Sequence, residues 1–456
     1  MMNSRIRSVR SQESTTRRLA LLGLGLLASV ILAACGSSSS SSGSNSGTGG
    51  ASSGALNSAQ AQQLKQLLAI TPTEAAKLKG KTFKIGAILP LSGAGATFAV
   101  DEGNGVKLAV DQMRRYLGIN VDYKALDHKS GDPQAGAADA RQLGIAGYGA
   151  VMNSYYGVFG ATLPALQSYH MLSFDPGGGT GNGFKGKPYF WGFRANTPDD
   201  GFFALRWFHQ ERPSLKRVAQ VIWDAGAAYV NPIQAHLKAR IAENGDTFVG
   251  SVLSPIGATD YSTVFSKLKD LNPQIIQVTV FGADPGYFMK QYVNSGLTAQ
   301  VLGAEWTPVA AQIAGSAFKN WYFGADYFNP SNPPNPYSKF FVTDYQRLFG
   351  APPNSYYEPN YYEATMAFLQ LALRVMDKGG DINSGQQLNA ALIANPTFKS
   401  LYGGNAATVG TLTLDPTTHD PTIRPVGLFI AGPPQKELAQ WNIGDAAGFK
   451  ILSTTP

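Results

Sequence analysis

The stretch Phe83-Lys84-Ile85-Gly86-Ala87-Ile88-Leu89-Pro90 decides the fold class. It is a short apolar run that stops at a proline, which is typical of a buried strand. Apolar residues then recur at helical spacing from Val106 to Leu117, so a helix is expected to follow the strand. Strand and helix signals alternate in this way about nine times, as far as Gly303.

This alternation predicts parallel sheets with helices on both faces. The other predicted strands are 121–126, 150–152, 171–174, 189–193, 218–223, 247–253, 274–281 and 300–303, and the helices include 133–147, 229–243 and those opened by Thr197-Pro198-Asp199, Asp260 and Asp284-Pro285. The roughly 375 residues after Thr82 exceed one compact core, so two domains are expected. The predicted fold class is α/β, with two doubly wound lobes and ligands bound beyond the carboxyl ends of the strands.

The N-terminal segment predicts export and lipid anchoring. Five arginines between Arg5 and Arg18 precede an apolar run of 16 residues, Leu19 to Ala34. The run is short for a membrane span but suits a secretory signal. It ends in Leu32-Ala33-Ala34-Cys35-Gly36, the pattern of a lipobox, so residues 1–34 are expected to be cleaved and Cys35 to carry lipid. The mature protein would be anchored to the outer face of the cell membrane; Arg17-Arg18 leaves the choice between general and twin-arginine export open.

A tether follows Cys35. Of the 19 residues from Gly36 to Gly54, 16 are Gly or Ser, so a flexible coil with an end-to-end distance of roughly 25 Å is expected. Residues 57–81 are polar and prone to form a helix, and we interpret them as a marginal helix or a second linker. Residues 35–81 are thus assigned to a tether and a polar helical linker.

Composition argues against several classes of function. Residues 1–34 hold five arginines and one glutamate, +4 of the net charge of +7, so the remainder carries about +3. That remainder has no run of five or more Lys or Arg, so no nucleic-acid partner is expected. Cys35 is the only cysteine, so no disulfide is expected.

No motif argues for catalysis. Gly181-Asn182-Gly183-Phe184-Lys185-Gly186 matches a dinucleotide-binding pattern in its letters, but Lys187-Pro188 follows where a helix would have to begin. The histidines lack the spacing of metal ligands. We therefore predict a protein that is not an enzyme, with no catalytic residues, no metal and no cofactor.

Three segments carry a resemblance to a known family. They are Lys84 to Gly93, Asp127 to Gln134 with its Gly131-Asp132-Pro133 turn, and Asn272 to Gly296 with the loop Phe281-Gly282-Ala283-Asp284. In this order they resemble the periplasmic leucine/isoleucine/valine-binding protein family, over about residues 82–430.

The resemblance implies a type I periplasmic-binding-protein-like fold: two lobes joined by a three-strand hinge, with a small ligand between them. The crossovers are expected near 194–197, 324–327 and 410–415. The N-terminal lobe would comprise 82–195 plus 325–412, the C-terminal lobe 196–324 plus 413–435, and 436–456 would be a C-terminal tail. The implied protein is a monomer that delivers its ligand to an ABC permease in the same membrane.

The resemblance also implies ligand-binding positions in the C-terminal lobe. Glu305 falls where the family places a carboxylate that accepts the ammonium group of the ligand, and Trp306 follows it. Phe281 and Tyr229 fall on aromatic wall positions, and Phe98 faces the same site from the first loop. For Glu305 a solvated loop position is the alternative, and for the aromatic residues it is core packing.

The N-terminal lobe departs from the family pattern. The family grips its ligand with a serine after one strand and a threonine after the next. The corresponding places are Tyr156-Gly157 and Gly177-Gly178-Gly179-Thr180, where the serine is missing. The backbone N–H groups of Gly177 and Gly179 and the Thr180 hydroxyl remain as donors.

The aromatic residues around these positions cast doubt on a branched-chain amino acid as ligand. An amino acid or a bulkier, flatter or less zwitterionic compound, such as an aromatic molecule, an amide or a urea, is consistent with this wall. The predicted function is that of a solute-binding lipoprotein of an ABC importer. The alternative is a ligand-sensing lipoprotein of the same fold, and an exported enzyme is the third and weakest candidate.

Overall fold

The computed structural model describes residues 49–93, 95–177, 184–194, 202–432, 435–443 and 445–455. The predicted signal peptide, Cys35, Gly179 and Thr180 lie outside these ranges. None of the helices within them combines the length and the apolar character that crossing a bilayer requires.

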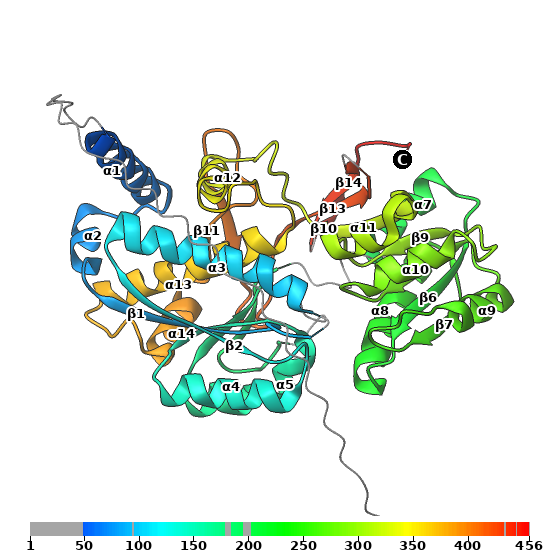
Figure 1. Ribbon diagram of the computed structural model, residues 1–456, viewed down its shortest axis with the longest axis horizontal. Helices are drawn as coiled ribbons and strands as arrows, with labels where there is room; N and C mark the ends of the chain where they lie inside the picture. Colours follow the sequence, from blue (N-terminus) through cyan, green and yellow to red (C-terminus); the bar gives the residue numbers. More distant parts are fainter. Residues whose placement is uncertain are drawn as a thin grey trace, which may run out of the picture. The chain divides into compact units, whose positions relative to one another are not determined.

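The first sheet is parallel and has the strand order β2-β1-β3-β4-β5. Its strands are β1 (Thr82–Leu89), β2 (Asn120–Asp127), β3 (Ala150–Asn153), β4 (Leu172–Asp175) and β5 (Phe190–Gly192). Helices α3 (Ala96–Leu117) and α13 (Tyr357–Asp377) lie along one face, and α4 (Pro133–Ile145) and α5 (Tyr156–Ser168) along the other (Figure 1). The predicted parallel sheet with two helical layers is confirmed for this lobe.

Local sequence accounts for these elements. Helix α4 is capped at its start, because the Asp132 carboxylate accepts hydrogen bonds from the backbone N–H groups of Gln134 and Ala135, and Pro133 occupies the first helical position. Helix α3 ends at Gly118, which adopts a left-handed conformation with φ 67°. Its apolar face, including Val106, Ala109 and Met113, is fully buried.

The second sheet has eight strands in the order β15-β14-β13-β10-β9-β8-β6-β7. Its parallel part consists of β6 (Arg217–Trp223), β7 (Thr247–Ser254), β8 (Ile275–Thr279), β9 (Gln300–Gly303) and β10 (Trp321–Asp326). Between these strands run α8 (Ala227–Glu243), α9 (Ser262–Leu271), α10 (Asp284–Tyr292), α11 (Pro308–Ala314) and the 3₁₀-helix η1 (Gly315–Asn320). Helix α7 (Leu205–Glu211) precedes β6.

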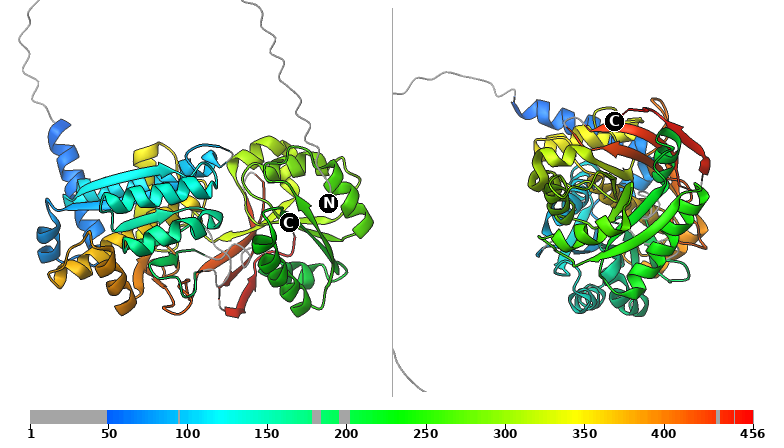
Figure 2. Two further views of the ribbon diagram at one scale, coloured as in Figure 1. Left: turned by 90° about the horizontal axis from the view of Figure 1, so that it is seen from below. Right: turned by 90° about the vertical axis from the view of Figure 1, so that its right-hand side faces the viewer.

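The rest of the second sheet is antiparallel, which the alternation up to Gly303 did not predict. Strand β13 (Pro425–Ile430) pairs with β10, β14 (Lys436–Asn442) with β13, and β15 (Asp445–Ile451) with β14. The segment predicted as a C-terminal tail, 436–456, therefore contains two strands of this sheet. Figure 2 shows these orange-red to red strands at one end of the sheet and the green strands β6 and β7 at the other.

The chain returns to the first lobe after β10. Helices α12 (Pro336–Phe349), α13 and α14 (Gly385–Ala394) precede the hairpin of β11 (Thr397–Ser400) and β12 (Gly410–Thr413). Strand β13 then enters the second sheet at Pro425, later than the crossover expected at 410–415.

The segment predicted as a marginal helix or second linker forms two helices that belong to the folded body. Helix α1 (Gly49–Leu67) begins inside the predicted Gly/Ser tether, and α2 (Pro72–Leu78) has a complete capping box between Thr71 and Glu74. Apolar residues of this segment are buried in the same cluster as the first sheet: Leu64, Leu67, Leu68, Ile70 and Leu78. Burial of these side chains, which polar composition concealed, holds the segment in place.

Candidate ligand site

Several candidate residues follow strands directly. In the first sheet Ser154 follows β3, and Asp175, the last residue of β4, precedes Gly177. In the second sheet Phe281 lies after β8 and Glu305 after β9. Open parallel sheets bind ligands at the carboxyl ends of their strands, so these side chains define the candidate site.

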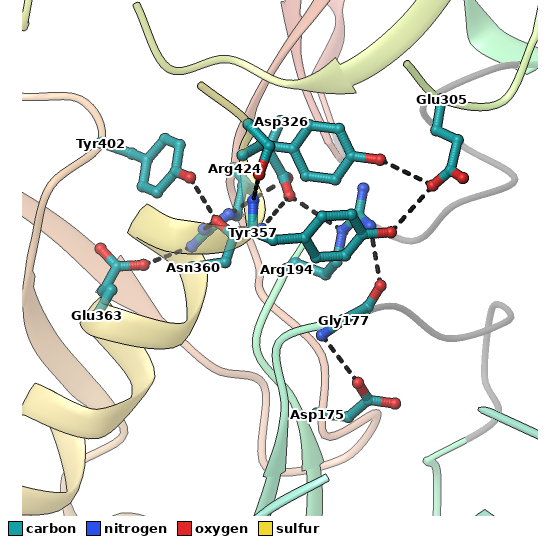
Figure 3. A network of polar contacts seen from close by, with 12 residues as sticks. Asp175, Gly177, Arg194, Glu305, Asp326, Tyr357, Asn360, Glu363, Tyr402 and Arg424 are labelled. Carbon is teal, nitrogen blue, oxygen red and sulfur yellow. Dashed lines mark hydrogen bonds and ion pairs between the residues drawn. The ribbon is translucent and has the colours of Figure 1, made fainter. Parts of the chain in front are cut away.

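Glu305 is almost fully buried, with 1% of its surface exposed. Its Oε1 accepts a hydrogen bond from the backbone N–H of Gly282 (2.8 Å). Its Oε2 accepts from the hydroxyls of Tyr356 (3.1 Å) and Tyr357 (3.0 Å), which lie at the start of α13 (Figure 3). Glu305, which follows a strand of the second sheet, is therefore held by two hydroxyls of α13, a helix that packs on the first sheet. Its burial excludes a solvated loop position.

The charge state of Glu305 reflects opposing effects. Burial raises the pKa of this carboxyl, because ionisation in a dry environment is unfavourable. The hydrogen bonds from Gly282, Tyr357 and Tyr356 and the positive charge of Arg194 act in the opposite direction. The Arg194 guanidinium lies 4.7 Å from the centroid of the Tyr356 ring, so it also stabilises the pair of tyrosines.

Aromatic side chains surround this carboxyl. Phe98 makes edge-to-face contacts with Tyr357 (5.3 Å between centroids) and Tyr155 (6.0 Å), and Trp223 does so with Phe281 (5.1 Å). Gly282 has φ 70°, and a Cβ atom there would lie 3.3 Å from Cε2 of Phe98. The backbone of the second lobe thus approaches the Phe98 ring closely at Gly282, where the absence of a side chain leaves room for the ring.

The other predicted wall residues occupy distinct positions. Tyr229 in α8 is half-buried, and its pKa is raised by burial and by the charge of Glu305. Trp306 is half-buried and packs against the main hydrophobic cluster. Tyr156 and Gly157 begin α5, and Gly177 is the last described residue of its loop. The structure therefore brings Glu305, Phe98 and Gly282 together, with Tyr229 close enough for electrostatic interaction.

Several residues on the first-sheet side were not predicted from the sequence. Strand β3 ends at Asn153, so the residue after it is Ser154, whereas the prediction looked for the serine near Tyr156-Gly157. The Ser154 hydroxyl donates a 2.7 Å hydrogen bond to Glu102 of α3. Glu102 had a detectable signal, because it interrupts the apolar face of α3 four residues after Phe98 and four before Val106.

Asp284 is also placed differently from the prediction. It was expected to cap α10, but Ala283 is the N-cap residue and the Asp284 carboxylate points elsewhere. Its Oδ2 accepts hydrogen bonds from Trp223 Nε1 (2.7 Å) and the backbone N–H of Gly257 (2.9 Å). The side chain thereby fixes the indole that packs against Phe281.

A buried ionic network lies beside the site (Figure 3). Asp326, at the end of β10, pairs with Arg194 (3.0 Å) and Arg424 (3.4 Å). Arg424 also pairs with Glu363 of α13 (2.7 Å) and donates to Asn360. Arg194, Asp326 and Arg424 come from the three segments that connect the sheets, so this network joins the crossovers to one another and to α13.

Comparisons with known proteins agree with this architecture. The family model of periplasmic binding proteins matches residues 82–420, which is more than half of the chain. No curated protein sequence matches significantly.

Solved structures match over most of the chain at low identity. A leucine binding protein, LivK, from Thermotoga maritima is 20% identical with a TM-score of 0.67, covering 80% of this chain and 99% of its own. LivJ, the branched-chain amino acid transporter substrate binding protein from Streptococcus pneumoniae, solved with isoleucine, is 18% identical with a TM-score of 0.66, covering 79% and 99%. An ABC transporter solute binding protein from R. palustris, solved with benzoate, is 18% identical with a TM-score of 0.65, covering 79% and 96%.

The chain belongs to the periplasmic binding protein family. Its fold is the two-lobed α/β fold of the leucine-binding-protein-like members, which confirms the predicted fold class and resemblance. Proteins of this family are solute-binding proteins and not enzymes, and membership implies an extracytoplasmic location.

Proposed function

We propose that this protein is the solute-binding component of an ABC importer. It would bind an amino acid or a related small polar or amide compound between its lobes and deliver it to a membrane permease. The observation that carries the proposal is Glu305, a buried carboxyl after β9 held by the Tyr356 and Tyr357 hydroxyls of α13. Family membership and relatives described as transporter components support it.

The proposed ligand residues are those that the sequence predicted, together with the two tyrosines. They are Phe98, Tyr156, Gly157, Gly177, Gly179, Thr180, Tyr229, Phe281, Glu305, Trp306, Tyr356 and Tyr357. The proposed lobe boundaries, 82–195 plus 325–412 and 196–324 plus 413–435, differ from the sheets in that β14 and β15 extend the second sheet beyond 435.

The test of solute binding is a thermal-shift screen of the detergent-solubilised full chain against amino acids, amides and aromatic acids. A ligand at about 100 times its Kd adds about 2.7 kcal/mol to the free energy of unfolding. For the compound identified, Glu305→Gln is expected to weaken binding roughly 10- to 100-fold in calorimetry, because a charge-assisted hydrogen bond is lost. The matched control is Glu437→Gln, because the Glu437 carboxyl in β14 is half-buried. Unchanged affinity of Glu305→Gln would exclude the assigned role.

We further propose that Cys35 is lipidated and anchors a monomer to the outer face of the membrane. A Cys35→Ser chain is then expected to incorporate no labelled fatty acid and to remain unprocessed or be released. Fatty-acid labelling of the variant equal to that of the wild type would contradict the lipobox interpretation. Uptake of the identified solute by cells with and without the gene separates a transport component from a sensor of the same fold.

A further inference from the structure

A second buried carboxyl group lies across the aromatic wall from Glu305. Glu102 is 1% exposed, and its Oε1 accepts the hydrogen bond from Ser154. Its Oε2 is buried and has no hydrogen-bond partner in the described part of the chain. A buried acceptor without a partner is costly, so this oxygen can accept a hydrogen bond from a bound ligand.

The surroundings of Glu102 are acidic and belong to the strand ends of the first sheet. A Cβ atom at Gly177 would lie 2.8 Å from the Tyr361 hydroxyl, 3.3 Å from Asp175 Oδ1 and 3.5 Å from Ser154 Oγ, so these groups converge on one point. Burial is the largest cause that raises the pKa of Glu102 to about 8; the Ser154 and Tyr361 hydroxyls act to lower this pKa, and the charges of Asp175 and Asp101 raise it. The charges acting on this carboxyl are therefore of its own sign.

Tyr155 connects the two carboxyl groups. It follows Ser154, and its ring contacts Phe98, which in turn contacts Tyr357. Beyond burial, the charges of Glu102, Glu305 and Asp284 all raise the pKa of its hydroxyl. Tyr155 also has φ 64°, a strained conformation for a bulky residue and one found at functional sites. Glu102 and Glu305 thus flank the same aromatic wall.

Among the described residues, which do not include Gly179 and Thr180, the donors that would hold an anionic group on the first-sheet side are already engaged. The Ser154 hydroxyl has one proton, which it donates to Glu102. The Gly177 N–H donates to Asp175 (2.9 Å). The nearby cation, Arg194, pairs with Asp326 (3.0 Å) and donates to the Gly177 carbonyl (3.0 Å). A ligand carboxylate placed here would lie against the acidic groups Glu102 and Asp175 and gain no donor from Ser154, Gly177 or Arg194, which is unfavourable.

Glu102 and Glu305, in contrast, both retain acceptor capacity. The Oε2 atom of Glu102 has no partner, and Glu305 uses three of the about four acceptor positions of a carboxylate. The rings of Tyr155, Phe98 and Tyr357 link the two carboxyl groups, and aromatic rings attract cations. We propose that the ligand is an organic cation without a carboxylate, an amine or amidine, held between Glu305 and Glu102. This inference rests on the proposed solute-binding function and specifies its ligand class.

The test compares pairs of compounds that differ in the charged group, by calorimetry on the detergent-solubilised full chain. Phenethylamine is phenylalanine without its carboxylate, and benzamidine is the cationic counterpart of benzoate. We expect phenethylamine to bind at least about tenfold more tightly than phenylalanine, and benzamidine more tightly than benzoate. Equal affinity, the reverse order, or binding by neither cation would overturn the inference.

Two variants assign the effect to Glu102. Glu102→Gln keeps an acceptor for Ser154 but cannot ionise beside a bound cation, and is expected to weaken phenethylamine binding about tenfold. Glu437→Gln, whose carboxyl pKa is likewise raised by burial, should bind as the wild type does. Thermal denaturation of both variants verifies folding, and unchanged affinity of folded Glu102→Gln counts against the inference.

If amino acids or benzoate bind and the cations do not, only the ligand class is wrong. If no solute of the broad screen binds, the proposed function itself fails.

Discussion

At the scale of single residues, the site consists of ionisable side chains whose properties are set by burial. Glu102 and Glu305 are each 1% exposed, and for both, burial is the largest influence on the pKa and raises it. The two differ in their partners. Glu305 receives donors from Gly282, Tyr356 and Tyr357, whereas Glu102 receives one from Ser154 and is opposed by neighbouring acids.

The raised pKa of Glu102 predicts how stability depends on pH. The folded state holds this proton up to about pH 8, while the unfolded chain releases it near the ordinary value of 4.5. Its contribution to stability is therefore fully present below 4.5 and is lost as pH rises towards 8, by up to about 1.4 kcal/mol per pH unit. We expect the free energy of unfolding, measured in urea at several pH values, to fall less steeply from pH 5 to 8 in Glu102→Gln than in the wild type.

Glu437, whose carboxyl pKa is raised to about 7, contributes to the slope in both proteins and cancels in the comparison. Parallel curves for the wild type and Glu102→Gln would show that Glu102 ionises freely in the folded state, contrary to this account.

At the scale of elements, helix α1 shows how a polar sequence conceals a packed helix. Its composition predicts a marginal helix or a linker, yet Leu64 is fully buried and Gln60 accepts a 2.9 Å hydrogen bond from the Tyr116 hydroxyl of α3. The apolar positions lie close to the C-terminal end of the helix and continue into Leu68 and Ile70, so a search for a regular stripe finds little.

Burial of Leu64 makes the role of α1 testable. Leu64→Ala is expected to reduce the free energy of unfolding by about 2–5 kcal/mol, because it removes a fully buried side chain and leaves a cavity. Gln63→Ala, at an exposed neighbouring position, should change stability by less than about 0.5 kcal/mol. Chemical denaturation measures both; similar small effects would mean that α1 is a detachable linker.

At the scale of the whole molecule, the segments that connect the two sheets are joined by a few buried ion pairs. Asp326 is fully buried between Arg194 and Arg424, one residue from each connecting segment, and Glu363 and Asn360 extend the network into α13. Arg194 also reaches the Gly177 carbonyl and the rings of Tyr356 and Tyr357. The hinge and the candidate ligand site therefore share residues.

Removal of the central carboxylate should be strongly destabilising. Asp326→Ala leaves two buried guanidinium groups without this partner, and we expect a loss of about 3–5 kcal/mol in the free energy of unfolding. The exposed pair Lys77–Asp377, 3.8 Å apart, is the control, because Asp377→Ala should cost less than about 1 kcal/mol. Comparable losses in the two variants, measured by guanidinium denaturation, would argue against a structural role of the network.

The sequence by itself determined the class of the protein, because regular alternation of apolar runs and helical spacing from Phe83 onward is a local signal. The resemblance of three segments to the periplasmic leucine/isoleucine/valine-binding protein family pointed to Glu305 and Phe281, which lie after β9 and β8 in the structure. The antiparallel strands β13 to β15 and the packing of α1 were decided only by the tertiary structure, because strand pairing and burial depend on partners distant in the chain. The same holds for Ser154, Glu102 and the tyrosines of α13. The hydrogen bonds and pKa shifts of these residues depend on neighbours from several elements, and those neighbours are distant from one another in the sequence.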